Sequence, residues 1–297
     1  MSFIADEIAR QPGAWRRAAE IAAATADGLP RPGERVAVVG CGTSWFMAEA
    51  YAVLREQAGH GETDAFAASL FPHGRGYDRL VAISRSGTTT EVIDLIERQR
   101  GRIPTTALVA SAATPVAELA EATIELPFAD EQSVVQTLFA TTALSVLRAS
   151  LGDRDRALVE ALADEAESVL IEPLPEEWLS AEQLTFLGRD WAHGVAREAA
   201  LKMREATQSW TEAYPSMEYR HGPISIAAPG RLVWHLGPDT EQLAVDVAPT
   251  GALFVDHAED PQVDLVRVQR LAAARAELTG LDPDRPRNLT RSVVLNG

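Results

Sequence analysis

The chain has 297 residues, 46% of them hydrophobic and 24% charged, which is ordinary for a folded protein and long enough for two domains. Its 27 basic and 43 acidic residues give a net charge of −16 without any lysine- or arginine-rich block, so the basic surface of a nucleic-acid-binding protein is absent. No apolar signal segment and no run of about eighteen apolar residues occurs, and the single cysteine precludes a disulfide within the chain, so we expect a cytoplasmic protein without a membrane span.

The first half of the chain alternates short apolar runs with helical patterns. A helical arm comes first and ends at Pro30 and Pro32. Strands alternating with helices are typical of a parallel sheet covered by helices on both faces. We predict strands at 35–39, 63–71, 79–83, 105–109 and 123–126, and helices at 3–27, 45–57, 88–100 and 133–151.

The second half repeats this alternation on a smaller scale after a charged helical connector. We predict strands at 184–187, 232–236, 243–247 and 252–255, and helices at 191–210 and 264–279. The pattern therefore indicates an α/β protein with two doubly wound lobes in tandem. The predicted parts are an arm at 1–29, a first lobe at 30–152, a connector at 153–181, a second lobe at 182–280 and a tail at 281–297.

The most informative segment is the turn Ser84-Arg-Ser-Gly-Thr-Thr-Thr-Glu91, which lies between a predicted buried strand and a helix. Ligands of open α/β sheets bind at the carboxyl ends of strands, and a helix N-terminus offers free N–H groups to an anion. The hydroxyls of Ser84, Ser86 and Thr89 could surround one phosphate, and Arg85 could add a forked donor if its side chain points inward. The alternative is a hydroxyl-rich helix cap without a ligand, although a cap needs only one hydroxyl.

A second turn, Gly40-Cys-Gly-Thr-Ser44, follows the first predicted strand in the same way. It matches neither a GxGxxG fingerprint nor a phosphate-binding P-loop, so a dinucleotide or ATP site is not supported. Two hydroxyl-rich turns at neighbouring strand ends instead favour one shared anion site that includes Thr43 and Ser44. We expect Cys41 to be buried and inert rather than a nucleophile.

With these motifs the chain resembles the sugar-isomerase (SIS) family, most closely the isomerase half of glucosamine-6-phosphate synthase, and it is similar to galactosamine-6-phosphate deaminases and fructosamine-6-phosphate deglycases. The resemblance implies tandem SIS lobes of flavodoxin-like form and a bound phosphorylated hexose or amino sugar, with the two turns holding the phosphate. The resemblance is carried by Glu7-Ile-Ala-Arg-Gln-Pro12, the two turns, Glu198-Ala-Ala-Leu-Lys-Met-Arg-Glu205, Glu212-Ala-Tyr214, Arg220-His-Gly-Pro223 and Pro286-Arg-Asn-Leu289.

Glu198, Lys202 and Glu205 lie at i, i+4 and i+7 of a predicted helix, and therefore on one face. From spacing alone a solvated salt-bridge face explains them. The resemblance implies instead that Glu205 is the catalytic base, with Glu198 and Lys202 as structural and substrate contacts. A carboxylate suits proton transfer next to a carbonyl, although Lys202 would stabilise its charged form and weaken it as a base.

His221 is the strongest candidate for opening the sugar ring, because an imidazole titrates near neutral pH. The resemblance implies that this histidine enters the site from a partner subunit, and hence that the protein is a homodimer. The alternative is a histidine with a purely structural role in its loop. The other histidines, His60, His73, His193, His235 and His257, show no ligand spacing, so no metal is expected.

Two differences from the synthase limit the resemblance. Arg291 stands where the synthase tail has a lysine that forms an imine, and an arginine remains protonated and cannot do so. Gln136 and Leu138 stand where the synthase has serine and lysine, and Gln136 could bind a different hydroxyl pattern. Nothing in the chain matches a glutaminase half, so glutamine-dependent amination is not expected.

We therefore predict an aldose–ketose isomerase or deaminase that acts on an amino-sugar 6-phosphate without metal or organic cofactor. A fructosamine-6-phosphate-type deglycase remains an alternative, as does an epimerase or etherase. A sugar-phosphate sensor without catalytic activity is the alternative from another class, but such sensors usually carry a basic DNA-reading domain.

Overall fold

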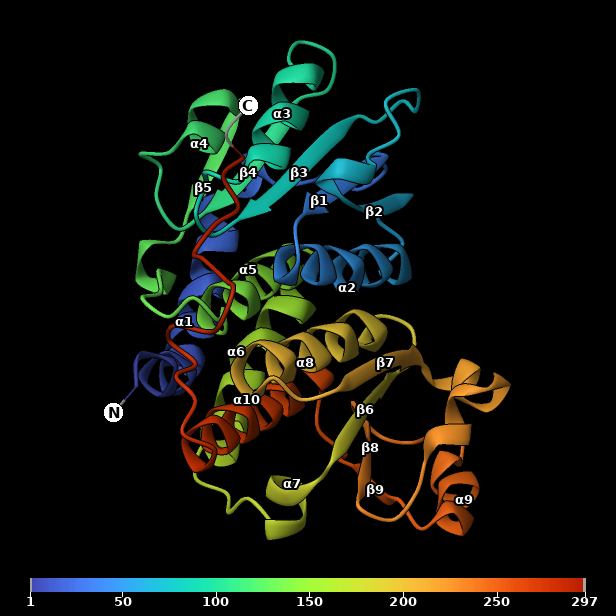
Figure 1. The fold of residues 1–297 in the computed structure, drawn as a ribbon. Helices are drawn as coiled ribbons and strands as arrows, with labels where there is room; N and C mark the ends of the chain where they lie inside the picture. The colour runs from blue at the N-terminus through green and yellow to red at the C-terminus, as the bar shows by residue number, and fades with distance from the viewer. Residues whose placement is uncertain (1, 296–297) are drawn as a thin grey trace.

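Two parallel β-sheets enclose a central layer of helices in the computed structural model, which describes residues 2–295 (Figure 1). The first sheet has the order β2-β1-β3-β4-β5, which is the flavodoxin-like order of a doubly wound sheet. The predicted strands of the first half are thus confirmed within a few residues at their ends. Its strands are β1 (Val36–Gly40), β2 (Thr63–Ala67), β3 (Arg79–Ser84), β4 (Thr105–Val109) and β5 (Ala122–Glu125).

The second sheet is smaller and repeats the first four positions of that order, as β7-β6-β8-β9. All of its strand pairs are parallel. Both sheets therefore have a point between their first and third strands where the winding direction reverses, and such a point is where doubly wound sheets bind ligands. The strands are β6 (Gln183–Gly188), β7 (Thr211–Pro215), β8 (Arg231–His235) and β9 (Leu253–Asp256).

Helices from both halves of the chain fill the layer between the sheets (Figure 1). The helix α5 is buried at all of its positions, as expected of a helix that is apolar on every side. The helices of this layer are α1 (Phe3–Ala24), α2 (Thr43–Gln57), α5 (Leu138–Ala149), α6 (Asp153–Val169), α8 (Ala192–Thr207) and α10 (Pro261–Leu278). The shorter or outer helices are α3 (Thr90–Gln99), α4 (Pro115–Leu119), α7 (Glu176–Ser180) and α9 (Leu243–Val247). Among residues 2–295 no helix combines the length and apolar character needed to cross a bilayer.

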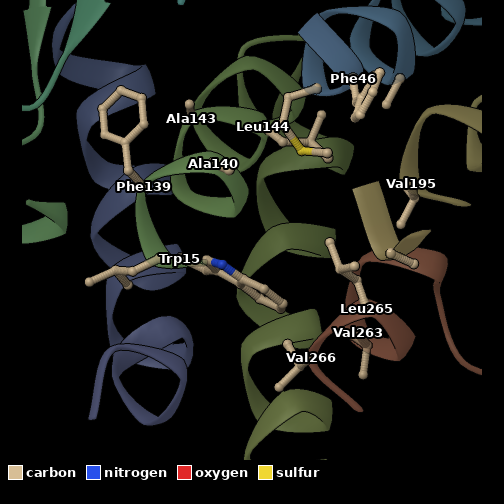
Figure 2. Packing of buried hydrophobic residues seen from close by; sticks show 14 of the residues in the cluster. Trp15, Phe46, Phe139, Ala140, Ala143, Leu144, Val195, Val263, Leu265 and Val266 are labelled. Atoms are coloured by element: carbon tan, nitrogen blue, oxygen red, sulfur yellow. The ribbon is translucent and has the colours of Figure 1, made fainter. Parts of the chain in front are cut away.

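One hydrophobic core runs through this helical layer and joins the inner faces of both sheets (Figure 2). Trp15 of α1, Phe139 of α5, Phe46 of α2 and Val195 of α8 all belong to it. The indole Nε1 of Trp15 donates to Thr141 Oγ1 at 3.0 Å, so its polar atom is satisfied inside the core. The two lobes are therefore not independent halves, because α8 of the second half packs directly on α2 of the first. The predicted connector also contributes α6 to this core.

Several predicted elements differ in the structure. The segment Leu243–Val247 is the helix α9 rather than a strand, since Leu243 and Val247 share one buried face at i and i+4. The strand β7 was not predicted, and neither was α4. The helix α5 begins at Leu138 instead of 133, because the carboxylate of Glu131 accepts the N–H groups of Thr137, Leu138 and Phe139 and so caps its first turn.

Candidate active site

The turn after β3 has the compact form expected of an anion-binding loop. Ser84 Oγ accepts the N–H of Gly87 at 3.1 Å, and Ser86 Oγ accepts that of Thr88 at 3.3 Å. Gly87 has a φ of +62°, and a Cβ at this position would lie 2.2 Å from Thr114 Oγ1. Only glycine therefore allows the turn to pack against the neighbouring loop. The hydroxyls of Ser86 and Thr89 lie 3.5 Å apart at the start of α3.

The turn after β1 lies next to the first, because β1 and β3 are neighbours in the sheet. A Cβ on Gly40 would lie 2.6 Å from the backbone of Ser44, so glycine is required where the chain turns sharply into α2. Ser44 and the β3 turn line one polar hollow of about 30 Å³. The structure thus brings residues of the two turns together around one hollow. The residues that line the hollow are Cys41, Ser44, Ile83, Ser84, Arg85, Ser86, Thr89, Val92, Gln136 and Arg291.

The C-terminal tail reaches the start of α3 (Figure 1, red), and its Arg291 is one of the residues that line the hollow. Thr88 Oγ1 donates to Ser292 Oγ at 3.0 Å, and the N–H of Thr90 donates to the carbonyl of Val293 at 3.2 Å. Further along, the N–H of Leu295 donates to Thr90 Oγ1 at 2.9 Å. A hollow of about 30 Å³ holds roughly one water molecule. Three hydrogen bonds fasten the tail to the 88–90 segment beside this hollow.

The two arginines predicted to contact the ligand, Arg85 and Arg291, mainly bind groups of the protein itself. The terminal nitrogens of Arg85 donate to the backbone carbonyls of Ser133, Val134 and Arg291, so they do not point at the hollow as a free fork. Of the three guanidinium nitrogens of Arg85, Nε alone is buried without a hydrogen-bond partner among the described residues. The guanidinium of Arg291 binds the carboxylate of Asp130 and the carbonyl of Glu131. Both arginines thus fasten the tail to the loop that follows β5.

The predicted acid–base face of α8 is buried rather than solvated. Glu198 is fully buried and Lys202 is 1% exposed, whereas the side chain of Glu205 keeps 18% exposure. Lys202 Nζ donates to Glu205 Oε2 at 2.5 Å and to Thr43 Oγ1 at 3.0 Å, and it lies 3.4 Å from Glu198 Oε1. Thr43 therefore contacts this cluster instead of lining the hollow. Because Ser44 follows it, the cluster and the hollow share the first turn of α2.

Burial sets the protonation of this cluster. Desolvation raises the pKa of Glu198 from its usual 4.5 to about 8, and the opposing attraction of Lys202 is weaker than that effect. The neighbouring carboxyls raise the pKa of Lys202 despite its burial. At neutral pH the cluster thus combines a neutral acid at Glu198, an ammonium at Lys202 and the more exposed carboxyl of Glu205.

A change at Glu198 should alter how stability depends on pH. Between pH 4.5 and about 8, Glu198 is protonated in the folded chain and ionised in the unfolded chain. Because unfolding releases this proton, the free energy of unfolding falls as pH rises through this window. Urea titrations at pH 5.5 and 8.5 measure this fall in the free energy of unfolding. We expect the fall between the two pH values to be roughly 2–3 kcal/mol smaller in Glu198→Gln than in the wild type. Equal losses in both proteins would contradict the raised pKa.

His221 stands apart from this cluster within one chain. It ends a 3₁₀ helix at Ser216–His221 and is exposed, and none of its described contacts is a hydrogen bond or ion pair with Glu198, Lys202 or Glu205. Gln136, in contrast, lines the hollow, and its buried Oε1 has no partner among residues 2–295.

Two buried acids that sequence reasoning did not select position the loop of Gln136. Glu131 caps α5 and lies 3.7 Å from Arg85, and Glu7 of α1 accepts the N–H groups of Gln132 and Ser133. Burial and the nearby charge of Glu131 raise the pKa of Glu7 to about 7. The only signal for Glu131 was an acidic residue just before a helix, which is common at helix starts.

No family model matches the chain. It is 27% identical to a glutamine–fructose-6-phosphate aminotransferase (isomerizing) of Gloeobacter violaceus, over 99% of this chain and 58% of the relative. A relative of the same name from Methanothermobacter thermautotrophicus is 29% identical, over 88% of this chain and 52% of the relative. The chain thus spans about half the length of the curated relatives it matches.

A solved structure shows the same fold. The glucosamine-6-phosphate deaminase from Thermotoga maritima superimposes with a TM-score of 0.82 at 23% identity, and the match covers 99% of this chain and 100% of that one. Together with the relatives, this match confirms the predicted resemblance to the SIS family and to the isomerase half of glucosamine-6-phosphate synthase.

Proposed function

We propose that this SIS-type chain binds an amino-sugar 6-phosphate and moves a proton between C1 and C2 of the open sugar, as an aldose–ketose isomerase or deaminase. One observation carries the proposal. A hydroxyl-lined hollow at two strand ends adjoins, through Thr43 and Ser44, a buried cluster that contains both an acid and a base.

The phosphate is assigned to the hollow. Hydroxyls of Ser44, Ser84, Ser86 and Thr89 line it, and the N-termini of α2 and α3 begin there. Helix N-termini attract anions through their free N–H groups and partial positive charge, so a phosphate can bind here in a chain of net charge −16. The tail would close over the sugar once the phosphate is bound.

Glu205 is assigned as the base, because it is the member of the cluster that combines partial exposure with a contact to Lys202. It takes the proton from C2 of the open aldose, which leaves an enediol-type intermediate. Returning a proton to C1 gives the 2-ketose or, from a 2-amino sugar, an imine at C2. Water adds to that imine and ammonia leaves. Lys202 holds the carboxylate in place and balances the charge that moves through the site.

An imine between enzyme and sugar is not part of this proposal. Lys202 is the only lysine in the sequence, and its raised pKa keeps it protonated at neutral pH, which prevents nucleophilic attack on a carbonyl. Arg291, at the position of the synthase lysine, cannot attack either. Reduction with cyanoborohydride in the presence of substrate should therefore leave Lys202 unmodified, and a reduced sugar adduct on Lys202 in a peptide mass map would contradict this assignment.

Ring opening is assigned to His221 of a second copy of the chain. Within one chain His221 is exposed and separate from the cluster, which is compatible with a role in a partner's site. The proposal thus includes a homodimer in which each site needs both copies.

A substrate panel tests the proposal. Glucosamine-, galactosamine-, fructose- and fructosamine-6-phosphates are each incubated with the protein, and ammonia, amine and ketose are measured. We expect turnover of at least one amino sugar, and a KM at least tenfold higher for Ser86→Ala because a hydroxyl contact to phosphate is lost. Tight binding of a sugar phosphate without any turnover would instead favour a sensor.

A further inference from the structure

A second polar cluster lies at the carboxyl edge of the second sheet, far along the chain from the site above. It contains His235 at the end of β8 and the loop residues Asp239 and Glu241, with one potential ligand atom from each within 4.8 Å of the others. The cluster occupies the position in the second sheet that the phosphate turn occupies in the first, after the strand next to the central β6. Its chemistry is the opposite, because it offers acceptors where the first sheet offers donors.

The orientation of His235 is that of a metal ligand. Its Nδ1 lies 2.9 Å from the carbonyl oxygen of Gly237, which can only accept, so Nδ1 carries the hydrogen. Its Nε2 then offers a lone pair, which accepts a hydrogen bond from Ser216 Oγ at 2.8 Å and lies 3.6 Å from Glu241 Oε2. A ring N–H bound to a backbone carbonyl is the arrangement that holds ligating histidines in proteins. His235 is 2% exposed, so the ring cannot turn into solvent.

Glu241 supplies the independent observation. Its side chain is 6% exposed, and Oε2 is buried without a hydrogen-bond partner among the described residues. The other oxygen, Oε1, accepts from Arg189 at 2.7 Å and from Thr240 at 2.9 Å, which fixes the carboxylate with Oε2 directed at the imidazole. Leaving a carboxylate oxygen buried and unpaired is costly, so the geometry calls for a cation or proton between Oε2 and Nε2.

We propose that His235, Asp239 and Glu241 bind a divalent cation of the zinc class. Neighbouring ligand atoms of a tetrahedral zinc site lie roughly 3.4 Å apart, since the metal–ligand bonds are about 2.1 Å long. The separation of 3.6 Å between Nε2 and Oε2 is close to this spacing. One histidine with two carboxylates suits zinc better than the all-oxygen sites of magnesium and calcium. Water would complete the coordination.

Further carboxylates near the cluster would balance the positive charge of a bound cation. Asp256 accepts the N–H of Asp239, and Asp190 lies beside Arg189, so four carboxylates including the two ligands face this edge. Arg189 is the cation in direct contact with Glu241, and Arg220 is paired with Asp246. Ser216 Oγ lies 2.8 Å from Nε2 and would have to release that nitrogen on metal binding.

The proposed metal would also order the segment that bears His221. Ser216 begins that segment, and Arg220 near its end donates to the carbonyl of Glu241 at 2.6 Å. A metal that fixes the 235–241 loop would hold the segment near its Arg220 end, because the contact between Ser216 and His235 is given up when the metal binds. This consequence rests on the proposed function, whereas metal binding itself does not.

The test uses the full chain, stripped of metal with a chelator that is then removed. Zinc is added in a calorimetric titration, and cobalt is added as a spectroscopic probe. We expect one zinc per chain, visible absorption from bound cobalt, and a rise of the thermal midpoint by several degrees. Zinc affinity should fall at least tenfold in Glu241→Gln and in Asp239→Asn, both of which keep the size of the side chain.

Glu218→Gln is the matched control, because it removes one exposed charge from the same lobe and should leave zinc affinity unchanged. Absence of saturable zinc binding, or equal binding by the wild type and both loop variants, would overturn the proposal. Activity is measured separately. Zinc binding without sugar turnover would refute the proposed function and not the metal site.

Discussion

Replacing Glu205 by glutamine is expected to abolish turnover while sugar-phosphate binding persists. General-base catalysis contributes about 10²–10⁴-fold to a rate, and an amide of the same shape cannot accept the C2 proton. The proposed phosphate contacts are Ser84, Ser86 and Thr89, which line the hollow and which the substitution leaves unchanged. We therefore expect kcat to fall by about a thousandfold and the dissociation constant to change by only a few-fold.

Kinetics and calorimetry on Glu205→Gln check this expectation. Glu160→Gln provides the matched control, since Glu160 is an exposed acid of α6 and its loss should change neither constant. Residual activity above a tenth of the wild-type kcat would contradict the assignment of Glu205 as the base. A large loss of binding with unchanged kcat would place Glu205 among the sugar contacts instead.

Replacing Lys202 by methionine is expected to have the largest effect on stability. The buried ammonium of Lys202 contacts Glu198, Glu205 and Thr43. Removing one partner of a buried ion pair lowers the free energy of unfolding by about 3–5 kcal/mol. Methionine is unbranched and nearly as long, so little of this loss would come from a cavity. We expect a loss of roughly 3 kcal/mol or more at pH 7.

Urea unfolding of Lys202→Met measures this loss. Arg16→Met is the comparison, because Arg16 is paired with Asp164 and Glu167 at the surface, where ion pairs contribute about 0–1 kcal/mol. A Lys202→Met protein within 1 kcal/mol of the wild type would show that the cluster does not depend on its ammonium.

The sequence predicted those parts of the fold and site that depend on short sequence patterns. Strands and turns of the first sheet followed from short apolar runs and hydroxyl-rich loops, and the meeting of Ser44 with the β3 turn followed from neighbouring parallel strands. The face shared by Glu198, Lys202 and Glu205 followed from helical periodicity. Spacing could not reveal that this face is buried, because burial depends on α2 packing against α8 from the other half of the chain.

Long-range contacts explain what the sequence could not predict. Arg85 lines the hollow, but its terminal nitrogens are bound by carbonyls of the loop after β5 and of the tail, which lie 48 to 206 positions away in sequence. The role of Glu7 depends on a loop 125 positions further on. His235 and Glu241 showed no recognised metal spacing, yet a tight loop after β8 brings them together.

The central claim is that hollow and cluster form one site, and a crystal structure of Glu205→Gln with an amino-sugar 6-phosphate tests it most directly. We predict phosphate oxygens about 2.7–3.2 Å from the hydroxyls or N–H groups of the 84–89 turn, with C2 of the open sugar beside the residue 205 amide. A phosphate bound outside this turn, or a sugar whose C1 and C2 point away from residue 205, would contradict the claim.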